Sequence, residues 1–316
     1  MFTTLFPTVV LGLAACQDYS YSEKTFSQTY VQEEFNSKAD LVFVIDDSPS
    51  MAEEQELLGY NFDVFVDVVE GTYADWQAAV ITTDVSTEEA GKVRGDFLSP
   101  DTPDLATAFI DAVSVGYRGS RDEQGLAAAA LALSPDHNPG LVRPGAKLNV
   151  IILSDEDDHS PGTVDAYLQD CRVASGNGDF AFHAIVGDLP EGCASGTSAA
   201  DPGVRYLEAA EKTDGYKDSI CAEDYTEILT QIGLDLSDLP DTFVLADPVE
   251  QASLEVWVDE AIIPNRDRDG WLFDAAQNAV VFSGYAVPRP GMSIAVYYEM
   301  GFGTVASGDD TGTAGR

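Results

Sequence analysis

Carboxylate and hydroxyl side chains gather in two short stretches of the sequence. Residues 46–50 read Asp-Asp-Ser-Pro-Ser and follow the apolar run 41–45. Residues 155–159 read Asp-Glu-Asp-Asp-His and follow a second apolar run at 148–153. Oxygen atoms of these types are the ligands that hard cations such as Mg²⁺ and Ca²⁺ prefer. The two stretches predict a divalent-metal site, provided that the fold brings them together.

The elements around these stretches predict such a fold. Continuous apolar runs are typical of central parallel strands that are buried on both faces. Apolar residues at helical spacing follow the first run, from Met51 to Val69. Further strands are expected at 77–83 and 180–186, and further helices at 104–113, 123–133, 164–173, 204–211 and 224–234. This alternation predicts an α/β fold with a doubly wound, mostly parallel sheet, in which ligands bind beyond the carboxyl ends of the strands.

The candidate metal ligands come from both acidic stretches. Ser48 and Ser50 are expected to bind the ion directly, and Asp46 and Asp155 directly or through water. The alternative is that Asp46 and Ser48 only cap the helix that begins near Met51.

The pattern Asp46-x-Ser48-x-Ser50 after a buried strand, with Asp155 ending a later strand, resembles the metal-ion-dependent adhesion site of von Willebrand factor type A (vWA) domains. The resemblance covers roughly residues 39–235 and implies a divalent cation: Mg²⁺, Ca²⁺ or Mn²⁺. One element departs from the family pattern, because the loop that should supply a Thr contains none. Asp122 lies nearest the expected position, with Ser120 and Glu123 as alternatives.

An acid in place of that Thr changes the charge of the site. A third carboxylate from Asp122 would make the centre net negative and would disfavour capture of an anionic ligand. We therefore hypothesise a preference for Ca²⁺ or Mn²⁺ over Mg²⁺, or a purely structural metal. Four neighbouring acids are expected to surround the ion or to hold a second cation, the alternative being a solvated acidic loop: Asp47, Glu123, Asp157 and Asp158.

The N-terminus has the features of an export signal. Residues 5–15 are mostly apolar, and the sequence Leu-Ala-Ala that precedes Cys16 resembles the lipobox of bacterial lipoproteins, although residues 2–15 contain no Lys or Arg. We expect a signal peptide at 1–15, lipid on Cys16, a polar tether at 16–38 and a place in the bacterial cell envelope. The alternative is an ordinary secretory signal with an incidental Cys.

Three cysteines remain, in a compartment where disulfides persist. Cys193 and Cys221 are the preferred pair, because both lie in loop-like segments around a helix, and Cys171 would then be free. Three cysteines allow three single bridges, so the other pairings stay open.

After the vWA-like domain at 39–238, the pattern changes to two-residue alternation. Residues 240–302 predict a small antiparallel β domain, and residues 303–316 predict a disordered tail. The stretch 265–270 resembles the start of an EF-hand loop. Its twelfth position would be Ala276, where a bidentate Glu is needed, so a polar turn is expected.

Composition limits the partners. The formal charge is −39, from 55 acidic and 16 basic residues. Such a field repels phosphate backbones and anionic headgroups, so nucleic acid is not expected as a partner and contact with a membrane is expected only through the lipid. The sequence contains no P-loop, dinucleotide-binding or nucleophile-elbow motif.

Lipobox, vWA-like domain and small β module together resemble a group of bacterial surface lipoproteins. The resemblance implies an envelope-anchored, metal-dependent, non-catalytic module that binds an unknown protein or surface ligand. One alternative is a scaffolding lipoprotein whose metal is structural. Another is a metal-dependent hydrolase that uses the second acidic stretch with His159.

Overall fold

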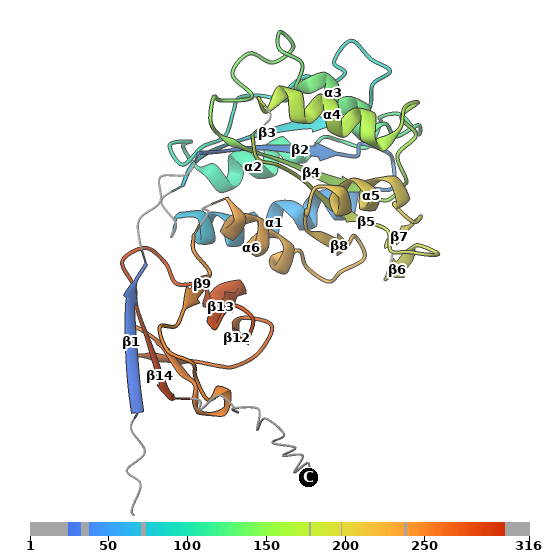
Figure 1. Cartoon of the computed structure of the whole chain (residues 1–316). Helices are drawn as coiled ribbons and strands as arrows, with labels where there is room; N and C mark the ends of the chain where they lie inside the picture. The colour runs from blue at the N-terminus through green and yellow to red at the C-terminus, as the bar shows by residue number, and fades with distance from the viewer. Residues whose placement is uncertain are drawn as a thin grey trace, which may run out of the picture.

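The computed structural model describes residues 25–32, 38–70, 74–176, 178–196, 198–236 and 239–300. The predictions for the signal peptide, Cys16 and the tail at 303–316 lie outside these ranges. The described chain forms an α/β domain and a β module, which are the upper and lower parts of Figure 1.

A parallel sheet of five strands forms the centre of the α/β domain. The strand order is β3-β2-β4-β5-β8, and all four pairings are parallel. These strands are β2 (Lys38–Ile45), β3 (Asp75–Thr82), β4 (Lys147–Ser154), β5 (Phe180–Val186) and β8 (Lys217–Ser219). The α/β prediction with a parallel sheet is confirmed.

Helices cover both faces of this sheet. One face packs against α1 (Ala52–Glu70), α2 (Leu105–Val113) and α6 (Thr226–Asp235). The other packs against α3 (Gly125–Ala132), α4 (Val164–Ala174) and α5 (Val204–Lys212). Phe43 contributes to the first core and Val44 to the second, and both side chains are fully buried. Burial on both faces explains why the strands are continuously apolar.

His183 of β5 is a satisfied core residue. Its Nε2 lies 3.1 Å from Asn149 Oδ1, and its Nδ1 accepts a hydrogen bond of 3.0 Å from the backbone N–H of Tyr216. Burial lowers the pKa of His183 to about 3. The ring is therefore neutral and has both nitrogens engaged within the fold.

The β module consists of two antiparallel sheets around their own core. One sheet has the order β1-β14-β10-β11 and the other β12-β13-β9. The strands are β1 (Thr25–Val31), β9 (Thr242–Val244), β10 (Glu255–Val258), β11 (Ala261–Ile263), β12 (Gly270–Asp274), β13 (Ala279–Ser283) and β14 (Ser293–Glu299), with short 3₁₀ helices η1 (Gln251–Ser253) and η2 (Gly284–Ala286). The stretch 265–270 connects β11 to β12, as expected of a turn.

Strand β1 corrects the boundary of the predicted tether at 16–38. Residues 25–31 pair along their whole length with β14. Phe26 and Tyr30 pack against the core of the module, whereas Ser27 and Thr29 are exposed. This is the two-residue period of a half-buried strand. The module is therefore built from segments on both sides of the α/β domain in the sequence.

A hairpin is tied to the α/β domain by a disulfide. The hairpin consists of β6 (Cys193–Ser195) and β7 (Ser198–Ala200), and Cys193 is bonded to Cys221. Cys171 is free and buried, so the preferred pairing is confirmed. None of the helices in the described ranges combines the length and apolar character that crossing a bilayer requires.

Candidate metal centre

The parallel register brings the two acidic stretches together. Ile45 of β2 is paired with Leu153 of β4, and the backbone N–H of Asp46 donates to Leu153 O at 3.0 Å. Asp46 and Asp155 therefore follow neighbouring strands at the same edge of the sheet. We call this region the acidic edge: Asp46, Asp47, Ser48, Ser50, Glu123 and Asp155.

Asp46 is fully buried and held in one orientation. Its Oδ1 accepts the backbone N–H of Ser48 at 2.8 Å, and its Oδ2 accepts the hydroxyl of Ser154 at 2.7 Å. Gln55 of α1 donates from Nε2 to the backbone oxygen of Asp46 at 2.9 Å. Each carboxylate oxygen keeps a lone pair, so Asp46 suits contact with an ion through water.

The two serine hydroxyls are spaced like neighbouring ligands of one small ion. Ser48 Oγ and Ser50 Oγ lie 3.1 Å apart. In an octahedron with bonds of about 2.1 Å, as for Mg²⁺, adjacent ligands are about 3.0 Å apart, and the longer Ca²⁺ bonds separate them by about 3.3–3.7 Å. Burial raises the pKa of Asp155 and the nearby Ser50 hydroxyl opposes this rise, which places a fourth candidate ligand near the pair.

Among the residues that the structure describes, three buried carboxylate oxygens of the acidic edge have no hydrogen-bond partner. They are Asp47 Oδ1, Glu123 Oε1 and Asp155 Oδ1. Burial, and then the charge of neighbouring carboxylates, raises the pKa of Asp47 and of Asp155 to about 6 and that of Glu123 to about 9. Buried acceptors without donors are costly, and a cation would satisfy them. The residues present therefore fit a divalent ion.

Glu123, and not Asp122, belongs to the acidic edge. The side chain of Glu123 is fully buried, and its Oε2 accepts a hydrogen bond from the hydroxyl of Thr83 at the end of β3. The side chain of Asp122 is 67% exposed, and its Oδ2 accepts the side-chain amide of Gln124 at 2.8 Å. A backbone hydrogen bond sets this orientation. The backbone N–H of His159 donates to the backbone oxygen of Glu123 at 2.7 Å and holds residue 123 against the second acidic stretch.

Gly119 permits the close approach of Asp47. The backbone N–H of Gly119 donates to Asp47 O at 2.8 Å. A Cβ atom at residue 119 would lie 2.0 Å from Asp47 Oδ1, well inside van der Waals contact. Only glycine therefore fits at this position without a shift of the carboxylate.

Asp157 and Asp158 hold helices in place. Asp158 Oδ1 accepts the backbone N–H of Leu126 at 3.1 Å, and its Oδ2 accepts Arg205 Nε at 2.9 Å. Asp157 Oδ1 accepts the backbone N–H of Arg205 at 2.8 Å. These carboxylates therefore anchor the first turns of α3 and α5, and the prediction of a second cation at these two residues gains no support.

The donor set of the acidic edge combines carboxylates with hydroxyls. Within the described ranges no cluster of three or more His, Cys, Asp or Glu side chains has the geometry of a metal site. The candidate set therefore depends on Ser48 and Ser50 beside Asp46 and Asp155. Water would complete the six positions, as is usual for Mg²⁺.

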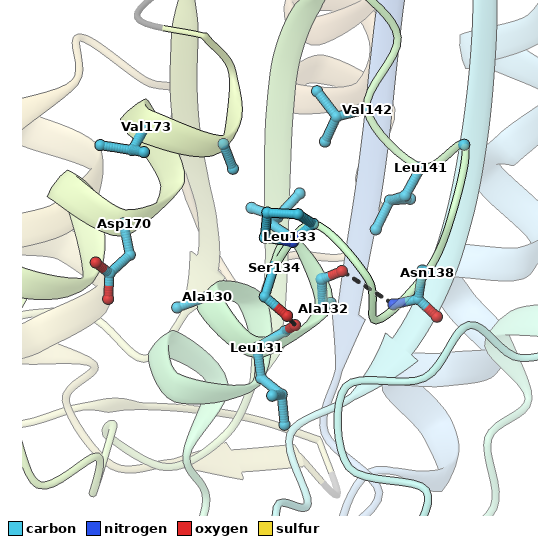
Figure 2. Close-up of a pocket in the computed structure, with 13 residues that line it drawn as sticks. Ala130, Leu131, Ala132, Leu133, Ser134, Asn138, Leu141, Val142, Asp170 and Val173 are labelled. Carbon is cyan, nitrogen blue, oxygen red and sulfur yellow. Dashed lines mark hydrogen bonds between the residues drawn. The ribbon is translucent and has the colours of Figure 1, made fainter.

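One hollow in the surface of the α/β domain lies away from the acidic edge. It measures about 570 Å³ and lies between the C-terminal ends of α3 and α4 and the loop at 133–142. Figure 2 shows Asn138, whose Nδ2 donates to Ala132 O at 3.0 Å, on one wall. Asp170 is its one acidic lining residue. The hollow lies toward the amino ends of the strands, because Gly125 at the start of α3 is near the acidic edge and Ala132 is at the other end of that helix.

Comparisons with known proteins show the fold. No family model matches the chain, and no curated protein matches it in sequence. The open conformation of the pilus adhesin SpaC from Lactobacillus rhamnosus GG is similar, with a TM-score of 0.52 at 13% identity, over 89% of this chain and 41% of the adhesin. A second structure of that adhesin gives 0.51 at 14% identity, over 87% and 41%. The chain thus spans about two fifths of the adhesin's length.

Proposed function

We propose that this protein is a vWA-type, divalent-cation-dependent binding module of the adhesion class, carried on the bacterial cell envelope by a lipid at Cys16, and that it is not an enzyme. The observation that carries the proposal is the acidic edge. Two serine hydroxyls 3.1 Å apart lie at the same edge of the sheet as buried carboxylate oxygens that have no donor within the described ranges. The structural likeness to a pilus adhesin supports the fold on which such a site is built.

The acidic edge would hold the ion through Ser48, Ser50, Asp46 and Asp155. A bound divalent ion with an open position supplies a Lewis-acidic contact for an oxygen of the ligand. The chain's own contribution is rigidity. Gln55 donates from Nε2 to both Asp46 O and Gly116 O at 2.9 Å. These two hydrogen bonds hold the loop at 46–50 against the loop that follows α2.

The absence of catalysis is proposed from the acids next to this site. Asp157 and Asp158 are engaged by α5 and α3, so they are not available as general bases. The ring of His159 lies 3.7 Å from the exposed carboxylate of Asp122. One alternative is a scaffolding lipoprotein whose metal is structural. Ligand binding that EDTA abolishes would favour the binding module over this alternative.

Thermal unfolding of residues 17–316 with EDTA, Mg²⁺, Ca²⁺ or Mn²⁺ tests the metal. An ion at ~100 times its Kd should stabilise the fold by about 2.7 kcal/mol, which raises the Tm by several degrees. Ser50→Ala and Asp46→Asn should lose this shift. Ser175→Ala removes a hydroxyl that donates to Arg172 O at 2.8 Å, in the turn after α4, and this variant should keep the shift. If no ion shifts the wild type, the proposed function is refuted.

A further inference from the structure

Another hollow lies between the first half of α1 and the loop that follows α2. It measures about 350 Å³ and has an aromatic side chain on each of these two elements. Tyr60 of α1 is 65% exposed and Tyr117 of the loop is 57% exposed, and both line the hollow. Exposed large apolar side chains are normally scattered singly, so two tyrosines on one hollow mark a candidate binding site. We call it the tyrosine hollow: Glu56, Tyr60, Ile110, Ser114 and Tyr117.

The packing of α1 against α2 sets the walls of this hollow, and the two helices lie on the same face of the sheet (Figure 1). Gly59 allows α2 to lie close to α1, because a Cβ atom there would be 3.2 Å from Ile110 Cγ1. The backbone N–H and the hydroxyl of Ser114 donate to Ile110 O at 3.0 and 2.6 Å and end α2. Gly116 then turns the chain with a φ of 94°, and Gln55 Nε2 donates to its oxygen at 2.9 Å. Backbone contacts therefore fix the position of both tyrosines.

Glu56 supplies the tyrosine hollow with a carboxylate. It lies one helical turn before Tyr60, on the same side of α1, and lines the same hollow. Hydrogen bonding to Glu56, and next the charge of Glu56, raises the pKa of Tyr60, so the hydroxyl and the carboxylate lie together. A carboxylate has about four lone-pair positions, so Glu56 can still accept hydrogen bonds from a ligand.

The charge around the tyrosine hollow is negative. Helices α1 and α2 contain neither Lys nor Arg. Their acidic residues are Glu53, Glu54, Glu56, Asp63, Asp67, Glu70 and Asp111. Arg118 follows Tyr117 in the chain, and among the described residues no basic side chain lines the hollow. The hollow therefore repels anions and attracts cations.

We propose that the tyrosine hollow binds the guanidinium group of an arginine side chain that a polypeptide partner presents. The flat guanidinium would stack on the rings of Tyr60 and Tyr117, and its N–H groups would donate to Glu56. Arginine fits better than a quaternary ammonium group, which has no N–H to donate to the carboxylate. A hollow of about 350 Å³ is near the lower limit for small-molecule sites, so it fits one side chain.

The inference goes beyond the proposed function, because it adds a second site that does not use the metal ion. None of the residues of the tyrosine hollow is a candidate metal ligand. Binding at the hollow should therefore persist in EDTA, and each of the two proposals can fail alone.

Titration of fluorescent pentapeptides of the form Gly-Gly-X-Gly-Gly, followed by anisotropy in EDTA, tests the inference. Salt at about 0.15 M screens the general attraction of cations to so acidic a chain. With X as arginine, the peptide should bind about tenfold more tightly than with X as citrulline, which has a similar shape without the charge. With X as trimethyllysine, a quaternary ammonium, the peptide should bind more weakly than the arginine peptide.

Substitutions in the hollow locate the binding. Tyr60→Leu and Tyr117→Leu should each weaken binding of the arginine peptide about two- to fivefold, the loss of one exposed contact between a cation and a ring. Tyr117→Phe keeps the ring and should stay within about twofold of wild type. Glu56→Gln should weaken binding about two- to fivefold, because it removes the carboxylate that accepts the guanidinium.

Two matched controls lie outside the hollow. Asp63→Asn removes a charge from an exposed position on the same helix, and Tyr297→Leu removes a tyrosine that is 40% exposed in the β module. Both should bind the arginine peptide within about twofold of wild type. All substituted side chains are exposed, so the Tm of each variant in EDTA should equal that of the wild type.

Four results would overturn the inference. They are equal binding of the citrulline and arginine peptides, tighter binding of the trimethyllysine peptide, unchanged affinity in both Leu variants, and an equal loss in Asp63→Asn and Glu56→Gln. The last would show a general effect of charge. If the arginine peptide binds as expected but no ion shifts the Tm, the metal proposal fails and the inference stands.

Discussion

Replacement of Glu123 by Gln is the sharpest test of the electrostatics of the acidic edge. The substitution keeps the shape of a fully buried side chain and removes its charge. Burial, and next the charge of Asp46, raises the pKa of Glu123 from 4.5 to about 9 in the metal-free protein. Because the folded-state pKa is the higher one, the contribution of Glu123 to stability is fully present below pH 4.5. It is lost as the pH rises through 9.

The size of the effect follows from the cost of an ionised, buried and partly unpartnered acceptor, which is about 1–3 kcal/mol. We therefore expect Glu123→Gln to be more stable than the wild type by about that amount at pH 9 in EDTA. The Tm would rise by roughly 2–4 °C for each kcal/mol in a domain of this size. The stability of the variant should also change less between pH 5 and pH 9, because the titrating group is gone.

Thermal unfolding at pH steps from 5 to 9 in EDTA measures both the stability difference at pH 9 and the change of stability with pH. Asp122→Asn is the matched control, because its carboxylate is 67% exposed. We expect the control to stay within about 0.5 kcal/mol of wild type with an unchanged pH profile. A Glu123→Gln protein that is less stable than the wild type at pH 9, with the same pH profile, would refute the reasoning.

Three further predictions concern the same edge, and a fourth concerns the proposed lipid anchor. Gly119→Ala should weaken Mg²⁺ binding measured by calorimetry, because the new Cβ would lie 2.0 Å from Asp47 Oδ1. Mg²⁺ affinity should fall as the pH drops through about 6, where Asp155 gains its proton, and titrations at pH 5 and pH 7.5 would show it. Calorimetry should give Mg²⁺ an affinity at least equal to that of Ca²⁺, because the serine hydroxyls are 3.1 Å apart. Cys16→Ser should move the protein from the membrane fraction to the soluble fraction, as read by fractionation and lipid labelling.

Much of the α/β domain could be predicted from local patterns. The helix predicted from Met51 to Val69 agrees with α1 to within one residue at each end, and 3.6-residue spacing alone predicted it. The candidate ligands Ser48 and Ser50 could be found in the sequence because they lie in one stretch of five residues directly after an apolar run. Asp155 could be placed beside them because parallel strands end at a common edge, and the register of β2 with β4 bears this out.

Features that depend on distant partners could not be predicted. Strand β1 reads as a polar segment, and its partner β14 begins at Ser293. The ion pair of Asp158, which lies in the loop after β4, depends on Arg205, which lies on the distant helix α5. The choice between Asp122 and Glu123 depends on backbone hydrogen bonds that a spacing argument does not contain.

The position of Glu123 changes the charge argument for the site. The sequence suggested that a third carboxylate would make the centre net negative and would disfavour an anionic ligand. The raised pKa means that Glu123 keeps its proton at neutral pH in the metal-free protein. Asp46 and Asp155 alone can then balance a divalent ion, which leaves the open position of the ion attractive to a carboxylate.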